Sequence, residues 1–417
     1  MMILARNFMA STQKLVKNFL EYLAESFVVL KESYIAIFIT ILTSLFAGIF
    51  LGKSTELLKS IPGLLVLIPG AIDMRGNIFS TLGSRLGSKF HLGLIEKFDI
   101  KNKFIRDEIY ASLTLTFLLS IFLGILAKFL SSSLGIESIS VYSLILISLI
   151  GGVTSGIILL ILTFIISFTA YAKGWDPDNV TAPLITALGD LFTIPTLLFA
   201  AYLVMIIQSY AQTIVFFLLV FALLNFVLIL KKENDFKVLI FHSSIALLAS
   251  GLLSCFSGVF MEINIEKLIV APSILLMIPA FLEEGGNISS VLASRLSSKL
   301  HLGLIKAEIK IDTTLKKEFF ISLLLYLLVF PIIGVLSHIL CITTGITSVG
   351  ILKSLIISTI AGFFLIVVMI AITFYISVVS YERGIDPDNV TIPIITSIAD
   401  IAGVLSLFIV SMFVLSW

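Results

Sequence analysis

The stretch PGAIDMRGNIFSTLGSRLGSKFHLGLI, residues 69–95, occurs again as PAFLEEGGNISSVLASRLSSKLHLGLI, residues 279–305, with 16 of 27 positions identical. A second motif, DPDNVTAPLITALGD at 176–190, returns as DPDNVTIPIITSIAD at 386–400, with 10 of 15 positions identical. Both pairs are separated by 210 residues. Because a long internal period reports duplicated structural units, the sequence predicts two copies of one fold without an insertion between their motifs.

Composition places the chain in a membrane. Apolar residues make up 59% of it and charged residues 13%, and the mean hydropathy is +1.15. The apolar residues form long blocks, and about 20 residues of helix, at roughly 1.5 Å each, cross a hydrocarbon core of about 30 Å. Several blocks reach that length, so the sequence predicts an all-α polytopic membrane protein whose first partner is the lipid bilayer.

The same composition argues against other classes of protein. The sequence has no dense run of basic residues with interleaved aromatics, so we expect no nucleic-acid partner. Cys255 and Cys341 lie in apolar stretches without CxxC spacing, which indicates neither a disulfide framework nor a zinc site. No part of the sequence is polar enough to form a sizeable soluble domain, and we therefore expect no enzyme activity.

Each copy contains five apolar segments of spanning length, and one more segment separates the copies. The expected spans are 34–52, 62–90, 109–130, 141–172, 180–207, 211–230, 238–260, 268–300, 319–342, 349–381 and 390–416. Five is an odd number, so direct fusion would invert the second copy, whereas the extra helix restores its direction. We predict about 11 spans in two parallel five-helix repeats, related by a pseudo-twofold axis along the membrane normal.

The domain organisation and the topology follow from this count. We assign 1–33 to an N-terminal cytoplasmic amphipathic segment, 34–208 to repeat 1, 209–236 to a linker with the extra transmembrane helix, and 237–417 to repeat 2. With the N-terminus inside, 21 of the 27 Lys and Arg residues fall on the inner side, which is the positive-inside pattern. We expect a multi-pass protein of the cell membrane with a cytoplasmic N-terminus and an external C-terminus.

One aspartate lies deep in the fifth span of each copy. Asp176-Pro177 is a typical helix start, which puts Asp190 about 20 Å along the helix and well inside the membrane. The face that carries it has the same residue types in both copies: Asn179, Thr186 and Asp190, then Asn389, Thr396 and Asp400. In parallel repeats Asp190 and Asp400 would meet, where like charges repel unless a cation joins them. We interpret the pair as a cation site rather than as two separate helix contacts.

The second span of each copy carries a further polar face. Pro69 is expected to interrupt this helix and to free backbone carbonyls, as is Pro279 in the copy. The matched polar residues are Asn77 and Asn287, then Asp73 and Glu283, with Glu284 as an additional acid. Intramembrane ionisable residues are functional candidates, and we expect these to line an ion path or a secondary site. Arg75 departs from the acidic pattern and is expected to pair with Asp73.

The candidate ligands are carboxylate, amide, hydroxyl and carbonyl oxygens. Hard cations prefer oxygen, whereas softer metals take nitrogen or sulfur. Mg2+ keeps several of its waters and needs few carboxylates, which fits two aspartates in a polar pore. Ca2+ and Mn2+ are also compatible with these ligands.

The two motifs, PxxxxxxGN and later DPxxxxxPxxTxxxD, resemble those of the transmembrane domain of the MgtE magnesium transport family. The resemblance covers roughly 34–417, and the two copies in one chain resemble the arrangement in solute carrier family 41. It implies two MgtE-like repeats joined by a linker helix. MgtE proteins are homodimers with five helices per subunit and a Mg2+ path between the subunits, so this chain would be a monomeric pseudo-dimer.

The resemblance also assigns residues and marks departures from the family. The family's pore aspartate falls on Asp190 and Asp400, and its GN asparagine falls on Asn77 and Asn287. The cytosolic N-domain and the CBS domains that sense Mg2+ have no counterpart here, which puts gating by such a sensor in doubt. Arg75 stands where the pattern has a small residue, and it makes the two halves unequal.

These observations favour transport of a divalent cation, Mg2+ first, through a pore at the interface of the two repeats. Channel and exchanger remain open, and an exchanger would use Na+ as the coupling ion. A carrier for another divalent cation or for a small organic solute is a further alternative. An intramembrane aspartyl protease also needs two membrane aspartates, but here both occupy copies of one motif rather than unlike motifs.

Overall fold

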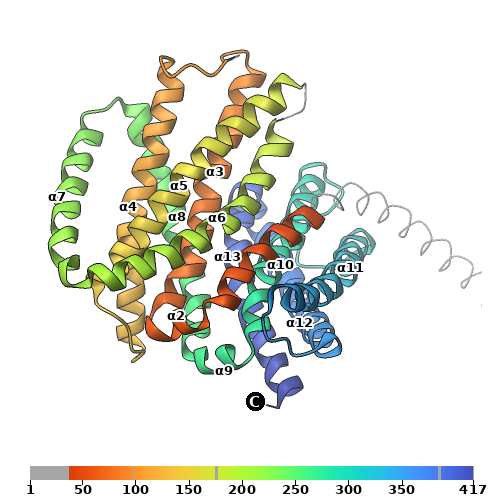
Figure 1. Ribbon diagram of the computed structural model, residues 1–417. Coiled ribbons are helices and arrows are strands. Elements are labelled where there is room, and N and C mark those ends of the chain that lie inside the picture. Colours follow the sequence, from red (N-terminus) through yellow and green to blue (C-terminus); the bar gives the residue numbers. More distant parts are fainter. Residues whose placement is uncertain (1–36, 96, 174–176, 384–386, 417) are drawn as a thin grey trace, which may run out of the picture.

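A computed structural model describes residues 37–95, 97–173, 177–383 and 387–416 (Figure 1). The predicted amphipathic segment 1–33 lies outside the described residues. The first half contains a helix over Ile37–Lys53, then α2 (Thr55–Ser60), α3 (Leu64–His91), α4 (Lys103–Ser133), α5 (Val141–Ala172) and α6 (Pro177–Ile207). After η1 (Gln208–Tyr210) and α7 (Ala211–Leu230), the second half contains α8 (Asn234–Ile263), α9 (Ile265–Val270), α10 (Pro272–His301), α11 (Thr313–Thr344), α12 (Ile351–Glu382) and α13 (Pro387–Leu415).

The described part of the chain is all-helical, and seven of its helices are long and apolar enough to cross a membrane. The helices of the two halves follow the same order: α5 starts at Val141 and α12 starts 210 residues later at Ile351. Asn102 caps α4, and Asp312 caps its copy α11, each through a side-chain oxygen that accepts a backbone N–H. The duplication in the sequence is therefore also a duplication of helix order and of helix starts.

The two halves interlock through the first helix of each. Figure 1 shows α3, α8, α10 and α13 in the middle, with α7 at one edge and α11 and α12 at the other. Helix α8 of the second half packs on α3 of the first and on α13 of its own half. In the same way the helix Ile37–Lys53 lies against α10, because Gly48 and Gly52 face the backbone of Leu276 and Pro272.

Glycine makes this close approach possible. A Cβ on Gly258 would overlap the carbonyl oxygen of Leu65 and lie 2.8 Å from the Cα of Val66. A Cβ on Gly48, the matching glycine, would overlap the carbonyl oxygen of Leu276. Small residues let helix backbones meet closely in membranes, where van der Waals packing replaces the hydrophobic effect as the main attraction.

The predicted interruption at the prolines is wrong. α3 continues through Pro69 and α10 through Pro279 as single helices. Pro69 has no N–H for the carbonyl of Leu65, and that carbonyl faces Gly258 of α8. Tight packing against a neighbouring helix allows a proline inside a transmembrane helix, so each proline changes the hydrogen bonding without ending the helix.

Glu262, near the end of α8, ties the halves together at the start of α3. Its carboxylate accepts the backbone N–H groups of Gly63 and Leu65 at 2.8 and 3.0 Å. These groups belong to the first turn of α3, where backbone donors have no partner inside the helix and the helix dipole favours negative charge. The contact fixes the position of α3 relative to α8.

The outer surface of the bundle is apolar. Helix α7 exposes many large side chains, among them Phe216, Phe217 and Leu223, each more than 60% exposed. An apolar surface of this extent would be an association site in water, and in a bilayer it faces acyl chains. α7 packs mainly on α5 at the edge of the bundle, with smaller contacts to α4 and α8, so it joins the two halves without lining the cavity between them.

We expect Gly48→Ala and Gly258→Ala each to lower the thermal stability of the purified protein, since each new methyl group would overlap a backbone oxygen that cannot move aside. Overpacking of this kind costs about 1–3 kcal/mol. The melting temperature in detergent measures the effect. Phe50→Ala on the same first helix, where the side chain is 45% exposed, is the matched control. A Gly48→Ala protein as stable as this control would contradict the interlocked packing.

Candidate functional site

A cavity of about 110 Å3 lies between the two halves, lined mainly by α3, α6, α10 and α13, with Leu51 of the first helix and Met261 of α8. Its polar lining consists of Asp73, Asn77, Thr186, Asp190, Glu283, Asn287, Thr396 and Asp400. About 10–15 Å3 of such volume holds one water, so the cavity has room for several water-sized particles. The structure thus brings together, from four separate helices, most of the polar residues that the sequence analysis predicted as site residues.

Other selected residues lie elsewhere. Glu284 is fully buried but does not line the cavity. The side chains of Asn179 and Asn389, at the starts of α6 and α13, lie outside the part of the structure that is described.

Small residues in the GN motif position the cavity wall. Gly76 on α3 faces Thr186 on α6, where a Cβ would lie 3.5 Å from the threonine methyl. Gly286 on α10 faces Thr396 on α13 at the same distance. The next residue of each motif, an asparagine, lines the same cavity as the deep aspartates. The glycine therefore fixes the helix spacing and the asparagine supplies the polar group.

Each deep aspartate is held by a serine of the first helix in its own half. The hydroxyl of Ser44 donates to Asp190 Oδ2 at 2.8 Å, and the hydroxyl of Ser254 in α8 donates to Asp400 Oδ2 at 2.8 Å. The two serines are 210 residues apart, as are the two aspartates. The same interaction thus occurs twice, and it leaves the second oxygen of each carboxylate for other partners.

The acids of the second-span helices face the deep aspartates of the opposite half. The main charge repulsion on Asp190 comes from Glu283 of α10, and that on Asp400 comes from Asp73 of α3. Asp190 and Asp400 also repel each other. Asn77 donates to Asp73 Oδ1 at 3.0 Å, one helix turn away, and Asn287 contacts Glu283 in the same way. Each side of the cavity therefore takes its carboxylates from both halves.

The donor set of the cavity consists of oxygen ligands. Among its lining residues there is no histidine or cysteine, and Met261 contributes the only sulfur. In the described part of the chain, no three His, Cys, Asp or Glu side chains are close enough to hold one metal ion together. This arrangement suits a cation that keeps much of its water shell, because few direct protein ligands are then required.

Arg75 does not pair with Asp73, so that prediction is wrong. Positions two apart on a helix point to different faces, and Arg75 leaves α3 on the side away from the cavity. There its guanidinium donates to the hydroxyl of Ser120 on α4 and lies on Gly152 of α5. The side chain is fully buried, and its Nε and Nη1 atoms have no hydrogen-bond partner among the described residues.

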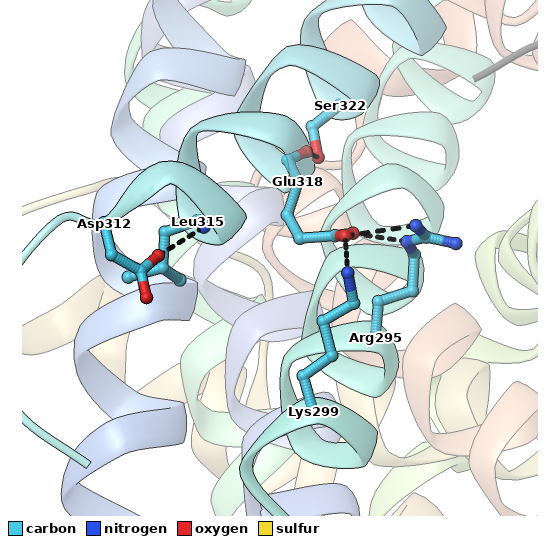
Figure 2. A network of polar contacts seen from close by, with 6 residues as sticks. All are labelled: Arg295, Lys299, Asp312, Leu315, Glu318 and Ser322. Atoms are coloured by element: carbon cyan, nitrogen blue, oxygen red, sulfur yellow. Dashed lines mark hydrogen bonds and ion pairs between the residues drawn. The ribbon is translucent and has the colours of Figure 1, made fainter. Parts of the chain in front are cut away.

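Near the C-terminal end of the second-span helix of each half, α3 or α10, a buried carboxylate binds basic side chains. Arg85 on α3 binds Glu108 on α4 through two nitrogens, with the shortest contact at 2.7 Å. In the second half Arg295 and Lys299 both bind Glu318 on α11 (Figure 2). Lys89, the copy of Lys299, instead lies over the ring of Phe104. One carboxylate thus holds one cation in the first half and two in the second.

The sequence interpretation missed several polar residues of this region: Thr40, Ser44, Ser254, Glu108, Glu318 and Glu262. Ser44 and Ser254, and Glu108 and Glu318, keep the 210-residue offset, so a search for matched polar residues across the copies would have found them. Glu262 has Gly52 as its counterpart, and only the folded structure brings it to α3.

A family model described as MgtE, divalent cation transporter, matches residues 68–200 and again residues 278–410. Solute carrier family 41 member 3 of Mus musculus is 24% identical over 365 residues, which cover 83% of this chain and 74% of the relative. Solute carrier family 41 member 2 of Mus musculus is 25% identical over 377 residues, 84% of this chain and 63% of the relative. The human member 2 is 24% identical over 382 residues, with 84% and 63% covered. No solved structure is significantly similar to the chain.

We expect Arg85→Met to destabilise the protein more than Arg295→Met does. Removing one partner of a fully buried ion pair leaves an uncompensated charge and costs about 3–5 kcal/mol, and the partly exposed arginine here puts the expected cost at or below the lower end. Among the described residues Glu108 pairs only with Arg85, whereas Glu318 keeps Lys299 after the second substitution. Melting temperatures in detergent compare the two variants, and the double variant Arg295→Met plus Lys299→Met should fall to the level of Arg85→Met. Equal losses in the two single variants would contradict this account.

Proposed function

This chain belongs to the MgtE family of divalent cation transporters, and from that premise we propose that it carries Mg2+ across the cell membrane along a path between its two repeats. Members of the family and its solute carrier 41 relatives are transporters and not enzymes. The observation that supports the path is the position of Asp190 and Asp400. They occupy equivalent places in the two matched regions, and both line one cavity between the halves.

The chemistry of the cavity supports a hard divalent cation. Its oxygen donors are the aspartates with Asn77 and Asn287, then Thr186 and Thr396, Asp73 and Glu283. Mg2+ dehydrates reluctantly and is bound through one or two carboxylates with several waters retained. A cavity with a few carboxylates and room for water fits that behaviour better than a closed all-protein cage.

The topology belongs to the same proposal. Repeat 1 spans 34–208 and repeat 2 spans 237–417, and α7 in the linker returns the chain to the starting side so that the repeats are parallel. A single chain then supplies both walls of the path, and no second subunit is needed to complete it. The excess of Lys and Arg between the spans favours a cytoplasmic N-terminus and an external C-terminus.

We expect Asp190→Asn together with Asp400→Asn to reduce Mg2+ uptake into proteoliposomes, loaded with a Mg2+-sensitive dye, to the level of empty liposomes. The amides remove both negative charges at the centre of the path while keeping size and hydrogen bonding. Asp107→Asn, a carboxylate outside the cavity lining that faces Lys232, is the control and should transport as the wild type does. Retained uptake by the double variant would move the path away from the aspartates.

The same vesicles separate the modes of transport. Uptake that follows the Mg2+ gradient and the membrane potential without Na+ indicates a channel, and a strict requirement for opposing Na+ indicates exchange. Competition by Ca2+ or Mn2+ measures selectivity among cations that share these ligands. A wild-type protein that moves no divalent cation under either driving force would contradict the proposal and favour a carrier of small organic solutes.

A further inference from the structure

The hydroxyl groups of the first helices divide the carboxylates between the halves into two groups. Among the acids of the opposite half, Glu283 repels Asp190 most strongly and Asp73 repels Asp400 most strongly, and Glu283 also interacts with Asp73 and Asp400. An asparagine completes each group, Asn287 beside Glu283 and Asn77 beside Asp73. Each group contains one acid from each repeat, so the two groups are copies of each other under the duplication.

The first helices add a hydroxyl pair to each group. On the Asp190 side, Thr40 donates to Glu284 and Ser44 donates to Asp190. These two hydroxyls are four residues apart and therefore share one helix face. On the Asp400 side, Ser254 donates to Asp400, and Ser250, four residues earlier, contacts Asp73.

Glu284 breaks the symmetry. Its side chain is fully buried, its Oε1 accepts from Thr40, and its Oε2 has no hydrogen-bond partner among the described residues. It lies close enough to Glu283 and Asp190 to repel both. The equivalent residue in the first half is Met74, which packs against Gly251 of α8. The Asp190 side therefore carries one more negative charge than the Asp400 side.

We propose that the cavity holds two divalent cations at unequal positions, a tighter one between Asp190 and Glu283 with Glu284 behind it, and a weaker one between Asp400 and Asp73. The inference rests on the proposed function and specifies its ion sites. Each position offers two carboxylates and an amide, and a serine hydroxyl orients one of the carboxylates. Water completes the coordination shell, as Mg2+ prefers.

Charge balance favours two cations over one. Buried charges need compensation, because an uncompensated charge in a low-dielectric interior is strongly unfavourable. One divalent cation leaves three of the five carboxylates unbalanced. Two cations leave one. Two neighbouring positions also allow one cation to displace the other, which permits strong binding together with release.

The test is a titration of the purified full-length protein in detergent with Mn2+, whose free form is counted by electron paramagnetic resonance. Wild type should bind two Mn2+ per chain with two affinities, and Mg2+ should compete at both. Glu284→Gln should weaken the tighter position about 10- to 100-fold, the range expected when a group behind a metal ligand is lost. Asp73→Asn should weaken the other position.

Met74→Glu adds the equivalent carboxylate to the first half, and it should raise the Mn2+ affinity of the weaker position toward that of the tighter one. Thr40→Val, which keeps the side-chain shape and removes the hydroxyl that orients Glu284, should act in the same direction as Glu284→Gln and serves if that variant does not fold. Elution volume and melting temperature monitor folding of every variant.

A single Mn2+ per chain, abolished by Asp190→Asn, would overturn the two-position inference and leave the proposed function intact. If Glu284→Gln and Thr40→Val each weakened both Mn2+ positions to the same extent, the assigned asymmetry would be overturned. Absence of Mn2+ binding together with absence of Mg2+ uptake by the wild type would overturn the proposed function itself.

Discussion

The main constraint on the structure is that carboxylates are buried inside a protein that spans the hydrocarbon core of a membrane. Charged groups at this depth are tolerated only where they face protein, water or a counter-ion. Here five of them lie within or beside one cavity, and the helices around it supply hydroxyl and amide donors rather than cationic side chains. Arg75, the cation nearest in sequence, turns the other way. The fold thus places several carboxyl groups together without a cationic side chain among the residues that line the cavity.

Duplication and divergence explain the unequal halves. Arg75 occupies a space between α3, α4 and α5, and in the second half the ring of Phe330 lies on Gly362 at the equivalent place. The counterpart of Phe330 is Ser120, the hydroxyl that Arg75 contacts. One half therefore exchanged an aromatic contact for a guanidinium–hydroxyl contact, and the other half gained Glu284 near the cavity. A pair of identical subunits could not make such single changes, whereas a fused pair can.

Much of the fold followed from the sequence because the repeat is exact in length. The positions of α5 and α7 were predicted correctly, since long apolar blocks bounded by turns mark such helices well. The short helices α2 and α9 were included in the neighbouring spans or left out, because six residues carry no periodic signal. The proline effect was misjudged because the residue types in α3 do not reveal how closely α8 approaches it.

The candidate site was less predictable than the fold. The matched acids and asparagines stood out in the sequence, and the structure places them around one cavity, while their ion binding stays a prediction. Parallel repeats suggested that Asp190 lies near Asp400, and the two do interact. That Glu283 of α10 also acts on Asp190, and Asp73 of α3 on Asp400, was not predictable from the sequence. The 210-residue offset marks Ser44 and Ser254 as a matched pair, and the distances to the aspartates show which groups they contact.

The interlocked first helices connect these groups to movement of the whole protein. The helix Ile37–Lys53 packs against α10 of the other half and donates to Asp190 of its own half. Helix α8 does the same with α3 and Asp400. A displacement of one half relative to the other would therefore alter both groups of carboxylates at once, because every group includes residues from both halves. The architecture accordingly couples the two groups of carboxylates to each other, and under the proposed function it would couple the two proposed cation positions as well.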